Sequence, residues 1–138
     1  MRIDWALPCR YAEALEDGTA TLVGAALDSI WLPELPGDVD LTLMLRVAAP
    51  PDEFEEPHRL DVRVIAPDRG EQPAISIEFG PLERPALLHP GMEGGLSVPA
   101  ELAWPAEEYG LYTLELYLDG QRQRSIPILV RDPEDIDA

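Results

Sequence analysis

The run Val39-Asp40-Leu41-Thr42-Leu43-Met44-Leu45-Arg46-Val47 decides the fold class, because every odd position in it is aliphatic. Successive side chains of a β-strand point to opposite faces, so these odd positions form one buried stripe. Residues 58–65 and 75–79 repeat the same alternation of apolar and polar side chains. The pattern predicts β-strands that each bury one face.

Two turns lie between such runs. Pro67-Asp68-Arg69-Gly70 combines a proline that fixes φ with a closing glycine, which is typical of a tight turn joining two strands. Asp119-Gly120 separates residues 112–118 from residues 122–131. An Asp-Gly pair between two strand-like runs predicts a β-hairpin, because both central residues of its turn must accept positive φ.

Other segments complete an all-β pattern. Strands are expected near residues 3–8, 19–27, 29–32, 73–80 and 95–103, whereas residues 12–17 and 49–57 are expected to be loops. The chain shows no sustained helical period, and its 15 prolines oppose long helices. About eight short strands with little or no helix predict an antiparallel, immunoglobulin-like β-sandwich, although alternation alone would also fit a closed barrel.

Tyr112 is the residue that favours the immunoglobulin-like form. It follows Gly110-Leu111 at the start of the penultimate expected strand, where a tyrosine hydroxyl can cap the crossing loop as a tyrosine corner. The alternative is an ordinary, half-buried strand tyrosine. Asp119 and Gly120 are also expected to have a structural role, because they form the turn of the last hairpin.

Length and charge limit the classes of function. The 138 residues predict one domain, residues 1–131, followed by a frayed acidic tail, residues 132–138. With 10 basic and 27 acidic residues, the formal net charge is −17. Phosphate binding needs clustered cations, so we expect neither nucleic acid nor an anionic membrane as a partner. The charge indicates a basic protein partner or serves solubility.

The ends and the cysteine content indicate a cytoplasmic protein. Asp4 and Pro8 interrupt the N-terminus before an apolar run of signal-peptide length forms, and no stretch approaches ~20 consecutive apolar residues. Cys9 is the only cysteine, so an internal disulfide is impossible. A reducing compartment is consistent with these features.

The opening stretch Asp4-Trp5-Ala6-Leu7-Pro8-Cys9-Arg10-Tyr11-Ala12-Glu13 resembles the start of a family of short bacterial proteins that form a domain of unknown function. The likeness continues through Val23-Gly24, Trp31-Leu32-Pro33, His58-Arg59-Leu60 and Gly110-Leu111-Tyr112-Thr113-Leu114. It spans nearly the whole chain, and the opening stretch is its most specific part. The resemblance implies a stand-alone bacterial protein and supplies no activity and no catalytic residues.

Cys9 is the one candidate nucleophile, with His58 or His89 as its base. Such catalysis needs a thiolate, and therefore a nearby base or positive charge. No oxyanion loop or glycine-rich elbow surrounds Cys9, so a buried, small apolar thiol is the favoured interpretation.

Metal and phosphate sites have weaker signals. The carboxylates of Asp52, Glu53, Glu55 and Glu56, with Asp38 and Asp40, suggest calcium, but the first cluster lacks a glycine bend and the spacing of an EF-hand. A solvated acidic loop is the favoured interpretation, and the chain has too few cysteines and histidines for zinc. Residues 91–95 are glycine-rich but lack the Lys-Ser/Thr of a phosphate loop. We expect no cofactor.

The three tryptophans, Trp5, Trp31 and Trp104, are the candidate interaction residues. Exposed together they would form a binding patch, whereas the favoured alternative is that they plug the ends of the fold. The sequence therefore predicts a non-enzymatic interaction or scaffold module. The alternatives are a small enzyme or metal-binding domain using Cys9 or a carboxylate cluster, and a structural subunit of an assembly, including a homo-oligomer.

Overall fold

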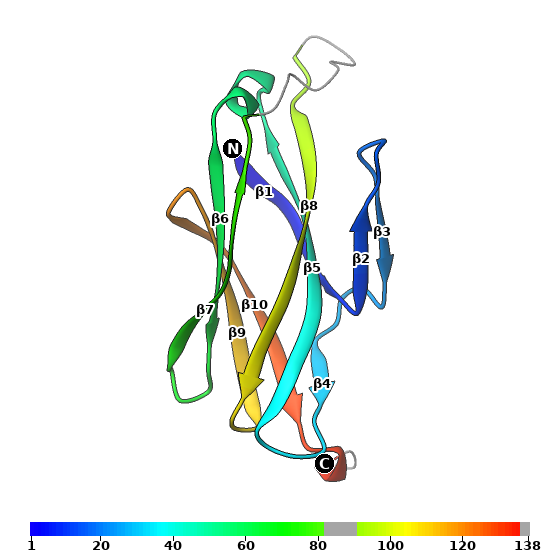
Figure 1. Ribbon diagram of the computed structural model, residues 1–138, viewed down its shortest axis with the longest axis vertical. Helices are drawn as coiled ribbons and strands as arrows, with labels where there is room; N and C mark the ends of the chain where they lie inside the picture. Colours follow the sequence, from blue (N-terminus) through cyan, green and yellow to red (C-terminus); the bar gives the residue numbers. More distant parts are fainter. Residues whose placement is uncertain (82–90, 136–138) are drawn as a thin grey trace.

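The computed structural model describes residues 1–81 and 91–135. These residues form ten strands and two short 3-10 helices (Figure 1). The strands are β1 (Arg2–Cys9), β2 (Tyr11–Ala14), β3 (Ala20–Val23), β4 (Ser29–Trp31), β5 (Gly37–Ala49), β6 (His58–Ile65), β7 (Glu71–Phe79), β8 (Gly94–Ala106), β9 (Gly110–Leu118) and β10 (Gln121–Arg131). The helices are η1 (Pro51–Glu55) and η2 (Pro133–Asp135). The prediction of an all-β chain is confirmed, with more strands than the expected eight.

The strands form three sheets. One has the order β1-β5-β8, the second has the order β4-β10-β9-β6-β7, and the third is the β2–β3 hairpin. All described pairings are antiparallel except that between β4 and β10, which is parallel. β5 and β8, with 13 residues each, are much longer than the short strands that the sequence predicts.

The two larger sheets enclose one hydrophobic core. Its buried residues are the alternate positions of β5 from Val39 to Val47, of β8 from Val98 to Ala106, of β6 from Leu60 to Val64, and of β9 from Tyr112 to Leu118. The alternation in the sequence thus identifies the core face of β5 and β6 correctly. Each buried leucine or valine contributes about 1.5–3 kcal/mol relative to an exposed one, so the core is the main source of stability.

The hairpin prediction at Asp119-Gly120 is confirmed. β9 and β10 pair along their length, and the two turn residues have φ of 51° and 84°. Positive φ at both central positions is the geometry of a type I′ turn, whose twist matches that of the flanking strands. The Pro67–Gly70 turn also joins two paired strands, β6 and β7, as predicted.

The β2–β3 hairpin is the main departure from prediction, because residues 11–14 are a strand rather than part of a loop. It lies to the right of β5 and β8 in Figure 1 and contacts both strands. A second apolar cluster fills the space beneath it, with Cys9, Ala12 and Met44 buried and Trp5 and Leu22 packed against them. β5 is therefore buried on both faces along its middle, which explains an apolar Met44 at an even position.

Two other segments are more structured than the sequence predicts. Residues 51–55 form η1, and Phe54 is buried in the main core, so the acidic stretch is anchored rather than fully solvated. At the start of the expected tail, Pro133–Asp135 form η2, and the preceding Asp132 carboxylate accepts a hydrogen bond from the Glu134 amide at 3.0 Å. Residues 136–138 of that tail lie outside the described residues. Among the described residues, none of the helices has the length and apolar character needed to cross a membrane.

Candidate functional site

One wall of the candidate site is the turn between β6 and β7. Ala66 and Gly70 close it with a 2.8 Å backbone hydrogen bond, and the Asp68 carboxylate accepts a second 2.8 Å bond from the Gly70 amide. Arg69 takes a positive φ of 70° at the tip. A side chain that bonds to the backbone two residues later is the usual way in which aspartate stabilises a turn, so the position of Asp68 is fixed locally.

The opposite wall is the connection between β8 and β9. The buried Tyr112 hydroxyl donates a 2.8 Å hydrogen bond to the Glu108 carbonyl, the contact that a tyrosine corner requires. Burial raises the pKa of the Tyr112 hydroxyl, so it remains a donor at neutral pH. The Trp104 ring lies beside that of Tyr112, with centroids 6.1 Å apart. This loop is therefore held by a buried polar contact and an aromatic pair.

Two contacts join the walls. The Asp68 amide donates to the Glu108 carboxylate at 3.1 Å, across 40 residues of sequence. Gly110 has a φ of +138°, and a Cβ placed there would lie 2.9 Å from Cγ of Pro67. Only glycine accepts both that backbone and that close approach without strain. The two loops are therefore in fixed register.

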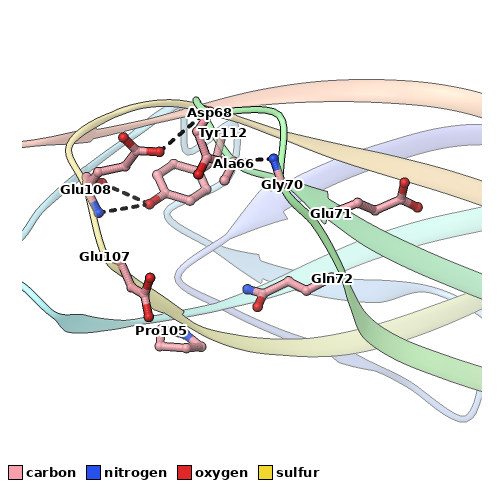
Figure 2. A pocket seen from close by; sticks show the side chains of 9 residues that line it. All are labelled: Ala66, Asp68, Gly70, Glu71, Gln72, Pro105, Glu107, Glu108 and Tyr112. Atoms are coloured by element: carbon pink, nitrogen blue, oxygen red, sulfur yellow. Dashed lines mark hydrogen bonds between the residues drawn. The ribbon is translucent and has the colours of Figure 1, made fainter.

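Between the walls lies a groove of about 410 Å³ (Figure 2). Its lining residues are Ala66, Asp68, Gly70, Glu71, Gln72, Pro105, Glu107, Glu108 and Tyr112, of which four are acidic and none is basic. In Figure 2 the Glu71 side chain points away from the other three carboxylates, and it is paired with Arg63 at 3.2 Å. Asp68, Glu107 and Glu108 thus give the groove a local excess of negative charge.

The three tryptophans lie in different environments and form no joint patch. Trp104 belongs to the main core and is 3% exposed. Trp5 packs against the small cluster beneath the β2–β3 hairpin. Trp31 is 40% exposed at the end of β4, with the Arg131 guanidinium 4.5 Å from its ring centroid. Only Trp31 presents a large surface to a partner.

Cys9 lies away from His58. Its thiol is buried in the small cluster and donates to the Leu7 carbonyl at 3.3 Å. Burial raises the pKa of the Cys9 thiol, which opposes formation of the thiolate that a nucleophile needs. His58 lies instead at the start of β6, where its ring stacks on Phe79. The other candidate base, His89, lies outside the described residues.

His58 links η1 to the β9–β10 turn. Its Nδ1 is 2.7 Å from the Asp119 carboxylate, and its Nε2 is 2.6 Å from the Glu53 carbonyl. The second oxygen of Asp119 accepts from the Arg59 amide at 2.9 Å. Burial by itself would lower the pKa of His58, but the bonds to Glu53 and Asp119 outweigh it and raise the pKa above its ordinary value. Both ring nitrogens face acceptors, which suits the doubly protonated imidazolium.

The carboxylates weighed for calcium do not converge. Within residues 1–81 and 91–135, no group of three or more histidine, cysteine or acidic side chains is placed to hold a metal ion. Glu53 pairs with the N-terminal amine of Met1, while Asp38 and Asp40 lie on β5. Of the glycine-rich residues 91–95, Gly94 and Gly95 begin β8 and pair with β5, and no helix follows them.

Sequence reasoning identified both loops of the groove but missed the groove itself. The Pro67–Gly70 turn and the Tyr112 corner have local signals, whereas their approach depends on a contact between distant segments. A weak signal was present in the consecutive pair Glu107-Glu108, which directly precedes the corner. An exposed acidic pair beside a fixed loop is a reasonable place to seek a charged surface.

Comparison with known proteins gives one match. A family model described as a family of unknown function (DUF6941) matches residues 4–131. No curated protein and no solved structure matches the chain. The match covers almost the entire described fold, including both walls of the acidic groove. The resemblance to a family of unknown function is thereby confirmed, and the chain belongs to the DUF6941 family.

Proposed function

We propose that this protein is a non-enzymatic interaction module that binds a basic segment of a protein partner in its acidic groove. The observation that carries the proposal is the composition of the groove, which combines four acidic lining residues with none that is basic. Glu107 is exposed, so its carboxylate is accessible to a partner. The net charge of −17 adds a long-range attraction for cationic partners.

Arginine is the side chain that suits this groove best. Its guanidinium can donate two parallel hydrogen bonds to one carboxylate, and its aliphatic stem can pack on the apolar atoms of the exposed Pro105. An exposed charge pair contributes only about 0.2–1 kcal/mol, so binding through a few such pairs is expected to be weak and reversible. Affinity should fall as salt is added, because exposed charges are screened.

The finer description of the fold belongs to the same proposal. An immunoglobulin-like sandwich is supported by the two sheets around one core and by the hydrogen bond of Tyr112 to Glu108. Loops at the end of such a fold commonly carry binding surfaces while the sheets hold them in place. We also propose a cytoplasmic location, on the basis of the free thiol at Cys9.

Fluorescence anisotropy with a labelled oligo-arginine peptide tests the proposal. Replacing Glu107 or Glu108 by glutamine removes one charge and keeps an amide oxygen as an acceptor. Each substitution is expected to weaken binding about twofold to fivefold, as the loss of one exposed charge pair would. The double variant should bind more weakly still, and every difference should shrink as the salt concentration rises.

Glu16→Gln is the matched control. Glu16 is an exposed glutamate in the turn of the β2–β3 hairpin, so the substitution removes the same charge outside the groove. It should leave the affinity within the error of the wild-type value. If Glu16→Gln weakens binding as much as Glu107→Gln does, the peptide responds to overall charge and the groove proposal fails.

A further inference from the structure

The outer face of the five-stranded sheet β4-β10-β9-β6-β7 has an exposed apolar half near the start of β9. Leu111 is 53% exposed, the largest fraction among the exposed large hydrophobic residues of the described chain. It pairs with Leu129 on β10, and Leu129 pairs in turn with Ser29 on β4. Trp31 lies two residues further along β4 on the same face, beside Arg131. Pro127, two residues before Leu129, lies on the same face and is exposed. These four residues form an apolar row across three strands.

The other half of this face is charged but balanced. It contains three ion pairs, Arg59–Asp61, Arg63–Glu71 and Arg122–Glu115, with N–O distances of 2.8, 3.2 and 2.8 Å. Glu78, opposite Arg59 on β7, and Arg131, which stacks on Trp31, complete the charged residues of the face. Four arginines and four carboxylates sum to a formal charge of zero.

This balance sets the face apart from the rest of the molecule. The chain has a formal charge of −17, all of which therefore lies outside this face. Two copies would repel one another through most of their surfaces, because like charges brought together are unfavourable. At the neutral face the local repulsion between two copies is weakest, and this face is also where Trp31 and Leu111 are exposed.

The size of the face suits a dimer interface. Strands lie about 4.8 Å apart and rise about 3.4 Å per residue, so the 40 strand residues of this sheet cover about 650 Å² in projection. A specific interface buries about 800 Å² on each partner. The available area is thus comparable with that of a modest, reversible dimer.

We propose that the occupant of this face is a second copy of the same chain, related by a two-fold axis. In such an isologous arrangement the same residues meet from both sides, so the Trp31–Leu111 row can pack against its own copy. The arginines and carboxylates of one copy then face those of the other with equal numbers of each sign. Glu71 belongs both to this face and to the groove lining, but it pairs with Arg63 and points away from the other groove carboxylates. The dimer requires no basic partner.

Sedimentation velocity of the full chain tests this proposal. From about 1 to about 100 µM, a range suited to a modest interface, the wild type should shift toward a species of twice the 15.3 kDa chain mass. Leu111→Glu places a charge at the most exposed residue of the apolar row and should leave the protein monomeric over the whole range. A wild-type protein that stays monomeric throughout would overturn the proposal.

Val23→Glu provides a closely matched control. Val23 is 52% exposed on the β2–β3 hairpin, so the substitution adds the same charge at an equally exposed strand position away from the face. This variant should dimerise like the wild type, and if it does not, the location of the interface is wrong. Leu111→Ser, which adds no charge, should weaken dimerisation at least fivefold with an unchanged melting temperature, so that loss of association cannot be attributed to misfolding. If Leu111→Ser dimerises as strongly as the wild type, the proposal is also overturned.

Discussion

The charged side chains at the two ends of β6 lie in opposite environments. At its start, His58 has an acceptor at each ring nitrogen, and Asp119 uses both carboxylate oxygens. Beyond its end, Asp68, Glu107 and Glu108 surround an open groove with no basic residue in its lining. Closed polar networks hold protein segments together, whereas unneutralised charge around a groove is suited to a ligand. We therefore describe the first end as a structural clamp and propose the second as a binding surface.

The largest effect is expected from Gly110→Ala at the groove end. The substitution forces an alanine to a φ of +138° and places its Cβ 2.9 Å from Pro67. Thermal or urea denaturation should show a loss of about 3 kcal/mol. Gly18→Ala is the control, because Gly18 has a φ of +88° with nothing within 4 Å of its Cβ. Equal losses at the two glycines would mean that the contact between the loops contributes nothing.

Asp119→Ala breaks the clamp at the other end. It removes the acceptor of both His58 and the Arg59 amide and leaves alanine at a positive φ of 51°. The free energy of unfolding should fall by about 2 kcal/mol. Asp119→Asn, which keeps an acceptor and tolerates the turn conformation, should cost less than half as much. If both variants lose the same amount, the Asp119 charge rather than the turn geometry dominates.

Tyr112→Phe tests how firmly the groove wall is held. The hydroxyl donates to the Glu108 carbonyl at 2.8 Å, and its loss leaves that acceptor without this partner. We expect a loss of about 1 kcal/mol, measured as a shift of the denaturation midpoint. An unchanged midpoint would mean that the Tyr112 hydroxyl does not stabilise this loop as a tyrosine corner does.

The smallest expected effect is a pH dependence of the free energy of unfolding, and it also arises at the clamp. His58 has a raised pKa in the folded state, so its contribution is fully present below its ordinary value of 6.5 and is lost as pH rises through the folded pKa. Burial acts to raise the pKa of Asp119, but the bonds from His58 and Arg59 lower it overall, so its contribution is lost only in acid. In urea melts across this range, His58→Gln should abolish the loss seen on the alkaline side. If stability still falls on the alkaline side in His58→Gln, titratable groups other than His58 cause the fall.

Much of the fold could be predicted from sequence, because its strands have local signals. Alternation identified β5, β6 and β7, and Asp119-Gly120 identified the last hairpin. β3 lies within the strand expected near residues 19–27, but β2 was expected to be part of a loop, so the β2–β3 pairing was missed. Ala12 of β2 is a small residue and packs in the minor cluster outside the main core. β4 was placed correctly, but its parallel pairing with β10 joins residues about 100 positions apart and has no local pattern.

The candidate site was less predictable for the same reason. His58 and Asp119 were each singled out, but their contact spans 61 residues and cannot be inferred from spacing. The groove depends on the 3.1 Å bond between the Asp68 amide and the Glu108 carboxylate, which joins the turn of the β6–β7 hairpin to the connection between two sheets that contains Glu108. Such contacts follow from the register of the sheets, which becomes known only when the sheets are assembled.

The most direct measurement is an NMR titration of the labelled protein with an oligo-arginine peptide. The groove proposal predicts saturable amide shift changes in residues 66–72 and 105–112, and none in the clamp formed by His58, Asp119 and η1. Shift changes that spread over the acidic surface, or that concentrate at the clamp, would contradict it.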